Sequence, residues 1–106
     1  MTGRILRVHP DVINSDVPAA LAYYDQIDRA LGDRFGQLIS DVLDGITKHP
    51  LFGREYLPGF RRVVTVPFPY MLVYVVEGSS IYVLALLHTK RNPDANRAIV
   101  QERGGE

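Results

Sequence analysis

The stretch FPYMLVYVVEGSSIYVLALLH, residues 68–88, decides the fold class of this chain. It contains two runs of β-branched, aromatic and leucine side chains, at 70–76 and 80–88, which are typical of β-strands. Glu77-Gly78-Ser79-Ser80 between them supplies a turn. Residues 60–66, FRRVVTV, have the same character, and two prolines separate them from the next run. We therefore predict three consecutive strands that pair as an antiparallel meander.

The second and third of these strands are apolar at both odd and even positions. A strand that has one face in water alternates apolar and polar residues, and these two do not. Two interpretations remain open at this point. Either both faces of the sheet are covered, or one apolar face awaits a partner.

Two amphipathic helices are predicted before the meander. In residues 16–32 the apolar side chains recur at helical spacing, with Asp16 as the expected N-cap and Gly32 as the expected end. Asp33 is the expected cap of a second helix, which His49-Pro50 ends. The remaining segments are a short strand at 5–8, a loop at 51–59 because of its glycines and proline, and a short helix at 95–102.

This order of elements, β-α-α-β-β-β, predicts an α+β fold: a helical hairpin packed on a mostly antiparallel four-stranded sheet. A length of 106 residues predicts a single domain over 1–106. Hydrophobic residues are 46% and charged residues 23%, which excludes a disordered or collagen-like chain. No apolar run approaches the length of a membrane span and no signal peptide is apparent, so we expect a cytoplasmic protein without membrane contact.

The charges balance over the whole chain but not within its halves. Net charge is zero, so no long-range field draws the protein to nucleic acid. Residues 1–50 carry two more acidic than basic side chains, and residues 51–106 carry the opposite excess. A solvated surface is sufficient to explain this difference.

Few residues suggest chemistry. Cysteine is absent, which excludes disulfides, thiolate metal sites and a cysteine nucleophile. Phosphate-binding loops and hydrolase signatures are also missing. His9 and His49 precede prolines at element ends and have no second ligand at metal spacing, so we predict neither a metal site nor a cofactor.

His88 is different, because it ends the third meander strand and is followed by Lys90 and Arg91. The meander places these residues beside Tyr70, at the start of the middle strand. Arg61 and Arg62 begin the first strand, at the opposite end, and point to opposite faces. A histidine, two cations and a tyrosine suit cleavage of a phosphodiester, but also a sheet end that only binds phosphate or an acidic partner. A solvated basic turn is the third interpretation.

A series of strings in a fixed order resembles a known family. They are YYD-x-I (23–27), LGDRF (31–35), HPLFGREY (49–56), FRRV (60–63), FPYMLVYVVEG (68–78) and VLALLHTKRNP (83–93). Together they resemble the RelE/ParE superfamily of toxins from type II toxin–antitoxin systems, also called plasmid-stabilisation proteins. The resemblance implies the α+β fold argued above and a cognate antitoxin that neutralises the toxin. Both a homodimer and a toxin–antitoxin hetero-oligomer remain open as assemblies. The apolar second face of the strands and the helical hairpin are the expected antitoxin surfaces.

The resemblance implies two alternative activities. RelE-like members cut mRNA on the ribosome, and in such an enzyme His88 would act as the base, with Arg91 and Arg61 binding phosphate. Those members carry an arginine after the tyrosine of the middle strand, where this chain has Met71. ParE-like members bind DNA gyrase without hydrolytic residues, and Lys90, Arg91, Arg62 and Tyr70 are then candidate target- or phosphate-binding residues. We predict the ParE-like activity, with a ribosome-dependent mRNA endoribonuclease (an mRNA interferase) as the alternative.

A third interpretation keeps the fold without toxicity and leaves a binding module. Under all three interpretations we expect the tyrosines at these helical and strand spacings to be core residues and not catalytic groups. They are Tyr23, Tyr24, Tyr70 and Tyr74.

Overall fold

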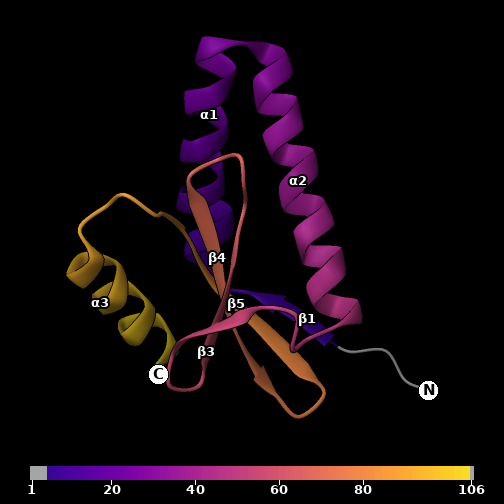
Figure 1. Ribbon diagram of the computed structural model, residues 1–106, viewed down its shortest axis with the longest axis vertical. Coiled ribbons are helices and arrows are strands. Elements are labelled where there is room, and N and C mark those ends of the chain that lie inside the picture. Colours follow the sequence, from indigo (N-terminus) through magenta and orange to yellow (C-terminus); the bar gives the residue numbers. More distant parts are fainter. Residues whose placement is uncertain (1–4, 106) are drawn as a thin grey trace.

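The computed structural model describes residues 5–105 and shows a five-stranded mixed sheet with helices on both faces (Figure 1). The first four residues and Glu106 of the predicted domain lie outside the described residues. Along 5–105, no helix combines the length and apolar character needed to cross a bilayer. The elements are β1 (Ile5–Val8), a π-helical turn (Val12–Asp16), α1 (Val17–Ile27), α2 (Arg29–Lys48), β2 (Arg54–Leu57), β3 (Phe60–Val64), β4 (Tyr70–Glu77), β5 (Ser80–His88) and α3 (Pro93–Gly104).

The strands lie in the order β1-β5-β4-β3-β2. The predicted meander is confirmed, because β3, β4 and β5 pair antiparallel in sequence. Strand β1 runs parallel to β5 at one edge of the sheet, and β2 forms the opposite edge. The α+β class is therefore confirmed.

The expectation of four strands is wrong by one strand. Residues 51–59 were expected to be a loop, but Arg54–Leu57 pairs with β3 as β2. The proline and glycine that suggested a loop form the hairpin turn instead. Leu57 faces Phe60 across Pro58-Gly59, and Gly59 has a φ of 86°, which a glycine adopts without strain.

The boundary between the two helices also differs from the prediction. α1 ends at Ile27, and the extended residue Asp28 caps α2 by accepting a hydrogen bond from the Ala30 amide at 3.0 Å. Gly32 and Asp33 therefore lie inside α2. Gly32 marks a close approach of α2 to α1 and not a helix end, because a Cβ there would lie 3.2 Å from the Asp25 backbone nitrogen and would displace the Asp25 carboxylate.

Asp16 does not cap α1 as expected. Its carboxylate accepts hydrogen bonds from the Leu86 amide at 3.0 Å and from Arg103 Nη1 at 2.7 Å. Arg103 Nη1 also lies 2.9 Å from the Leu84 carbonyl oxygen. The short β1 pairs only with Ser80–Val83, so this ion pair satisfies backbone groups of β5 beyond the reach of β1.

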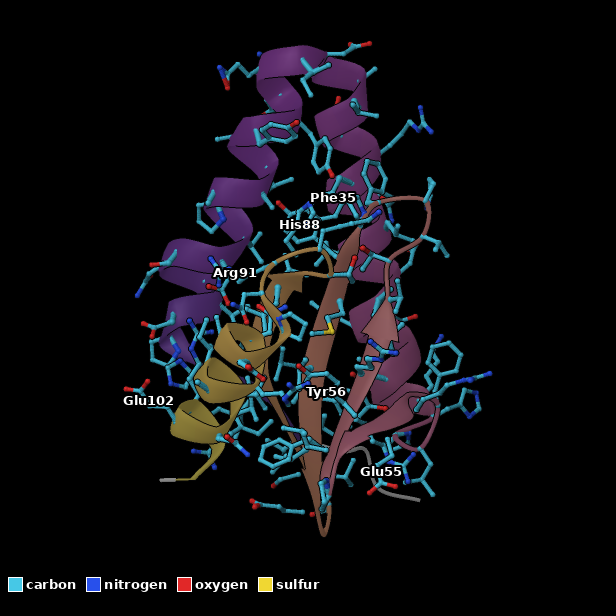
Figure 2. The ribbon with its side chains drawn as sticks, turned by 60° about the vertical axis from the view of Figure 1, so that its left-hand side comes forward. Phe35, Glu55, Tyr56, His88, Arg91 and Glu102 are labelled. Atoms are coloured by element: carbon cyan, nitrogen blue, oxygen red, sulfur yellow. The ribbon has the colours of Figure 1, made fainter. Side chains whose placement is uncertain are left out.

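Both faces of the central strands β4 and β5 are covered, which decides between the two interpretations of the strands. The α1/α2 hairpin covers one face around Phe35, Leu72 and Tyr74. Helix α3, which begins slightly earlier than expected, covers part of the other around Val73, Leu84 and Val100 (Figure 2). The second apolar face of β4 and β5 is therefore not an open surface for a partner.

Candidate functional site

The start of β4 and the end of β5 bring the main candidates together. Tyr70 pairs with His88 in the register, and their rings lie 5.0 Å apart at 71°. Thr89 fixes this end of the sheet, because its amide donates to the Pro69 carbonyl oxygen at 2.8 Å and its hydroxyl to the same oxygen at 3.2 Å. The predicted proximity of His88 and Tyr70 is thus confirmed.

A cavity of about 390 Å³ opens between this end of the sheet and α1. Its lining is mostly aromatic: Tyr23, Tyr24, Ile27, Pro69, Tyr70 and His88. The sequence interpretation missed the part played by α1, because the expectation was that the tyrosines at 23, 24, 70 and 74 belong to the core. Tyr24 and Tyr74 are buried as expected, whereas Tyr23, which lines the cavity, is 56% exposed. The YYD string at residues 23–25 was the one feature of the sequence that could have indicated a role for α1 in this cavity.

Two tyrosine hydroxyls of this cavity, those of Tyr24 and Tyr70, are held in their protonated form. Burial raises the pKa of the Tyr24 phenol, and the neighbouring Tyr70 and Tyr23 raise it further. Burial also raises the pKa of Tyr70, with Tyr23 acting in the same direction and Arg91 against it. The phenols of Tyr24 and Tyr70 are therefore hydrogen-bond donors at neutral pH, not bases.

One ring nitrogen of His88 already accepts a hydrogen bond from the backbone. Its Nδ1 atom accepts a hydrogen bond from the Lys90 amide at 3.0 Å, so in the neutral imidazole the proton resides on Nε2. In this tautomer the outward nitrogen is a donor. To act as a general base, His88 must first break the hydrogen bond that holds its own turn.

The turn after His88 displays Lys90 and Arg91, both exposed. The His88 carbonyl oxygen accepts hydrogen bonds from the Arg91 amide at 3.1 Å and from Asn96 Nδ2 at 3.0 Å. Asn92 caps α3 by accepting from the Asp94 amide at 2.8 Å. Sequence reasoning missed Asn96, a buried residue of α3 that holds this turn in place. Figure 2 shows His88 and Arg91 at the same end of the sheet.

The structure does not bring Arg61 and Arg62 to this site. Arg61 pairs with Tyr74, four positions along β4 from Tyr70, or about 13 Å at strand spacing. Its Nη1 donates to the Gly53 carbonyl oxygen at 2.7 Å. Arg62 lies on the opposite face of the sheet, where its Nη1 is 3.7 Å from Met71 Sδ. The separation of these arginines from His88 was predicted and is confirmed.

Met71 lies in the core between the sheet and α3 and is 3% exposed. The position at which RelE-like members carry an arginine is therefore occupied here by a buried thioether side chain. Among the described residues, no group of three or more histidine, aspartate or glutamate side chains is arranged to hold a metal ion.

Comparisons with known proteins agree with this fold and also indicate a protein family. Residues 17–93 match the family model described as the ParE toxin of the type II toxin–antitoxin system parDE. The chain is 33% identical over 107 residues to proteins named Toxin ParE2 from two Mycobacterium tuberculosis strains, covering 97% of both chains. A solved structure, a chain of the chromosomal ParDE toxin–antitoxin system from P. aeruginosa, superposes with a TM-score of 0.70. It is 16% identical and covers 82% of this chain and 97% of its own.

The fold and the sequence matches thus define a small toxin of a type II toxin–antitoxin system. More narrowly, this chain belongs to the ParE toxin family. The resemblance to the RelE/ParE superfamily is confirmed on its ParE side, and membership of this family implies a cognate antitoxin partner.

Proposed function

We propose that this chain inhibits growth in the cytoplasm by binding DNA gyrase, and that its cognate antitoxin neutralises it. Membership of the ParE family supports this proposal. A gyrase-binding toxin needs a stable recognition surface and no acid–base residues. The exposed Tyr23, Lys90 and Arg91 around the aromatic cavity would then be contacts with the target.

The strongest support is that the residues needed by a nuclease are apart or already engaged. Arg61 binds a backbone carbonyl about 13 Å along the strand, His88 Nδ1 accepts a backbone amide, and Met71 replaces the expected cation in the core. Loss of one group that stabilises developing charge costs about 100-fold to 1,000-fold in rate. This arrangement therefore favours binding over cleavage.

The test is a supercoiling assay with purified gyrase, relaxed plasmid and this protein, with and without its antitoxin. We expect the protein to inhibit supercoiling and the antitoxin to restore it. In cells, labelled thymidine incorporation should fall within minutes of induction, before amino-acid incorporation falls. Normal supercoiling together with an early collapse of amino-acid incorporation would contradict the proposal.

The ring contact between His88 and Tyr70, with the exposed Arg91 in the turn that follows, favours one alternative, a ribosome-dependent mRNA endoribonuclease. In that enzyme His88→Ala and Arg91→Ala would each lower cleavage about 100-fold or more. Mapping of mRNA 5′ ends after induction distinguishes the two activities. New ends that disappear in both variants would establish the endoribonuclease, and unchanged ends would exclude it.

A further inference from the structure

Two arginines face each other on the outer strands of the sheet. Arg54 of β2 pairs directly with Arg62 of β3, so their side chains project from the same face. Like charges placed directly opposite each other destabilise a sheet. Within residues 5–105, neither guanidinium has a carboxylate within ion-pair distance. The fold therefore holds two uncompensated positive charges side by side.

The other face of the same two strands is different. The next pair in the register, Glu55 and Arg61, places opposite charges across from each other. Arg61 also donates to the Gly53 carbonyl oxygen. Charge is thus balanced on one face of this hairpin and unbalanced on the other, although both pairs join the same two strands, β2 and β3.

The surroundings of the two arginines are apolar and concave. A cavity of about 440 Å³ is lined by Phe52, Gly53, Arg54, Arg62, Val63 and Val64, with no acidic side chain among them. Phe52 is 61% exposed and Val64 38%. The Arg62 guanidinium lies 5.7 Å from the centre of the Tyr56 ring, which restricts its orientation.

The backbone beside this cavity is also open to a partner. β2 is the last strand of the sheet, so its outer edge has no strand partner among the described residues. Unpaired strand edges accept extended peptides, whose backbone adds a strand while their side chains occupy neighbouring pockets. We call this combination of Arg54, Arg62, Phe52, Val64 and the β2 edge the β2–β3 surface.

We propose that the β2–β3 surface binds an extended, acidic segment of the antitoxin, whose carboxylates pair with Arg54 and Arg62 and whose apolar side chains contact Phe52 and Val64. This inference rests on the proposed neutralisation by an antitoxin and adds where and by which chemistry it occurs. Carboxylates match the fork geometry of guanidinium groups, so each arginine can bind one in bidentate fashion.

A polypeptide fits the β2–β3 surface better than a nucleic acid. Phosphate chains are bound by many cations along a track, typically about six to ten contacts, whereas this cavity offers two. The net charge of zero gives no long-range attraction to polyanions. The exposed Phe52 and Val64 and the free strand edge need apolar side chains and backbone amides, which an extended peptide supplies.

The test measures the dissociation constant of the complex with the cognate antitoxin by isothermal titration calorimetry. Arg54→Ala and Arg62→Ala should each weaken binding about tenfold, and the double variant about 100-fold, as expected for lost charge-assisted hydrogen bonds. Arg7→Ala is the matched control. Arg7 is an exposed arginine on the opposite edge strand, also 5.7 Å from a tyrosine ring, and its loss should not change the affinity.

A stability measurement separates binding from folding. Arg54→Ala removes a like-charge pair, so its Tm should equal or exceed that of the wild type while its antitoxin affinity falls. Hydrogen exchange should also slow at Arg54–Leu57 when the antitoxin is bound. A lower Tm without a loss of affinity would show that Arg54 is structural and would overturn the inference.

Three further results would overturn it. If the wild-type chain binds the antitoxin and the double variant binds equally tightly, the docking inference is wrong and the proposed neutralisation stands. If the wild-type chain does not bind the antitoxin, both fail. Arginine-dependent binding of a labelled 20-nucleotide single-stranded DNA, with unchanged antitoxin affinity, would assign the surface to nucleic acid instead.

Discussion

Asp16 and Arg103 form the most consequential ion pair in the described chain, because both side chains are largely buried, at 11% and 14% exposure. Asp16→Asn should lower the free energy of unfolding by about 2 kcal/mol, since it removes the closer of the two carboxylates beside the buried Arg103 and leaves only Asp11, 3.7 Å from Arg103 Nε. Urea denaturation measures this loss. The control is Asp44→Asn, which breaks the exposed pair with Lys48 and should cost less than about 0.5 kcal/mol. Equal losses in the two variants would contradict the assignment.

Tyr74 joins β4 to the segment before β2 through its buried hydroxyl. The hydroxyl donates to the Pro50 carbonyl oxygen at 2.7 Å and accepts from the Gly53 amide at 2.9 Å. Tyr74→Phe leaves both groups without that partner and should cost about 2 kcal/mol in urea denaturation. Tyr82→Phe, at a half-buried side chain whose hydroxyl makes no such hydrogen bond within residues 5–105, is the control and should cost little.

The raised pKa values of Tyr74 and two other tyrosines predict how the stability of the fold depends on pH. Burial raises the pKa of Tyr74 above its ordinary value of 10.0, against the lowering effects of the Gly53 amide and Arg61, and burial likewise raises the pKa values of Tyr24 and Tyr70. Above pH 10 the unfolded state therefore binds fewer protons than the folded state, and stability falls as pH rises. Absorbance titration near 295 nm should show part of the tyrosine ionising only above pH 10. Complete ionisation near pH 10 without unfolding would contradict this.

At the scale of elements, the entry into β2 depends on a glycine that cannot be enlarged. A Cβ at Gly53 would lie 2.7 Å from the Tyr74 hydroxyl and 2.8 Å from the Arg62 carbonyl oxygen, and a backbone atom in a sheet cannot move away cheaply. Gly53→Ala should cost about 2 kcal/mol or more. Gly45→Ala, in α2 where a Cβ meets no atom within 4 Å, should instead stabilise by about 0.5–1 kcal/mol. Thermal unfolding of both variants measures the difference.

Most elements could be predicted because hydrophobic spacing alone defines them, as in the strands at 70–77 and 80–88. β2 could not be recognised by composition, because a proline and a glycine mark a hairpin turn as readily as a loop, and only the pairing of Leu57 with Phe60 decides between them. The helix boundary was misplaced because Asp28 and Asp33 are equally good caps in sequence, and the packing of Gly32 against α1 favours the former.

The part of the candidate site that lies on the meander strands could be predicted, because strand pairing alone determines which residues are neighbours there. Adjacent strand ends place His88 beside Tyr70, and strand length separates both from Arg61. The contribution of Tyr23 depends on how α1 packs against the sheet, which no local pattern specifies. The roles of these residues remain predictions.

At the scale of the whole molecule, the sheet separates two surfaces. The aromatic cavity lies between α1 and the ends of β4 and β5, whereas Arg54 and Arg62 project from the opposite face near β2. Figure 2 shows Tyr56, beside Arg62, well away from the His88 end of the sheet. A toxin organised in this way can present one surface to its target and another to its antitoxin.

The sheet also separates two apolar cores, one under the α1/α2 hairpin and one under α3. Ile46 and Val100 are fully buried in different cores, so Ile46→Val should cost about 1 kcal/mol and Val100→Ala about 2 kcal/mol. Because the two sites share no contacts, the double variant should lose about the sum, within about 0.5 kcal/mol. Because one sheet carries both cores, all variants should still unfold in a single transition, seen alike by circular dichroism and tyrosine fluorescence. Two transitions, with α3 lost first, would show that the second core is an independent unit.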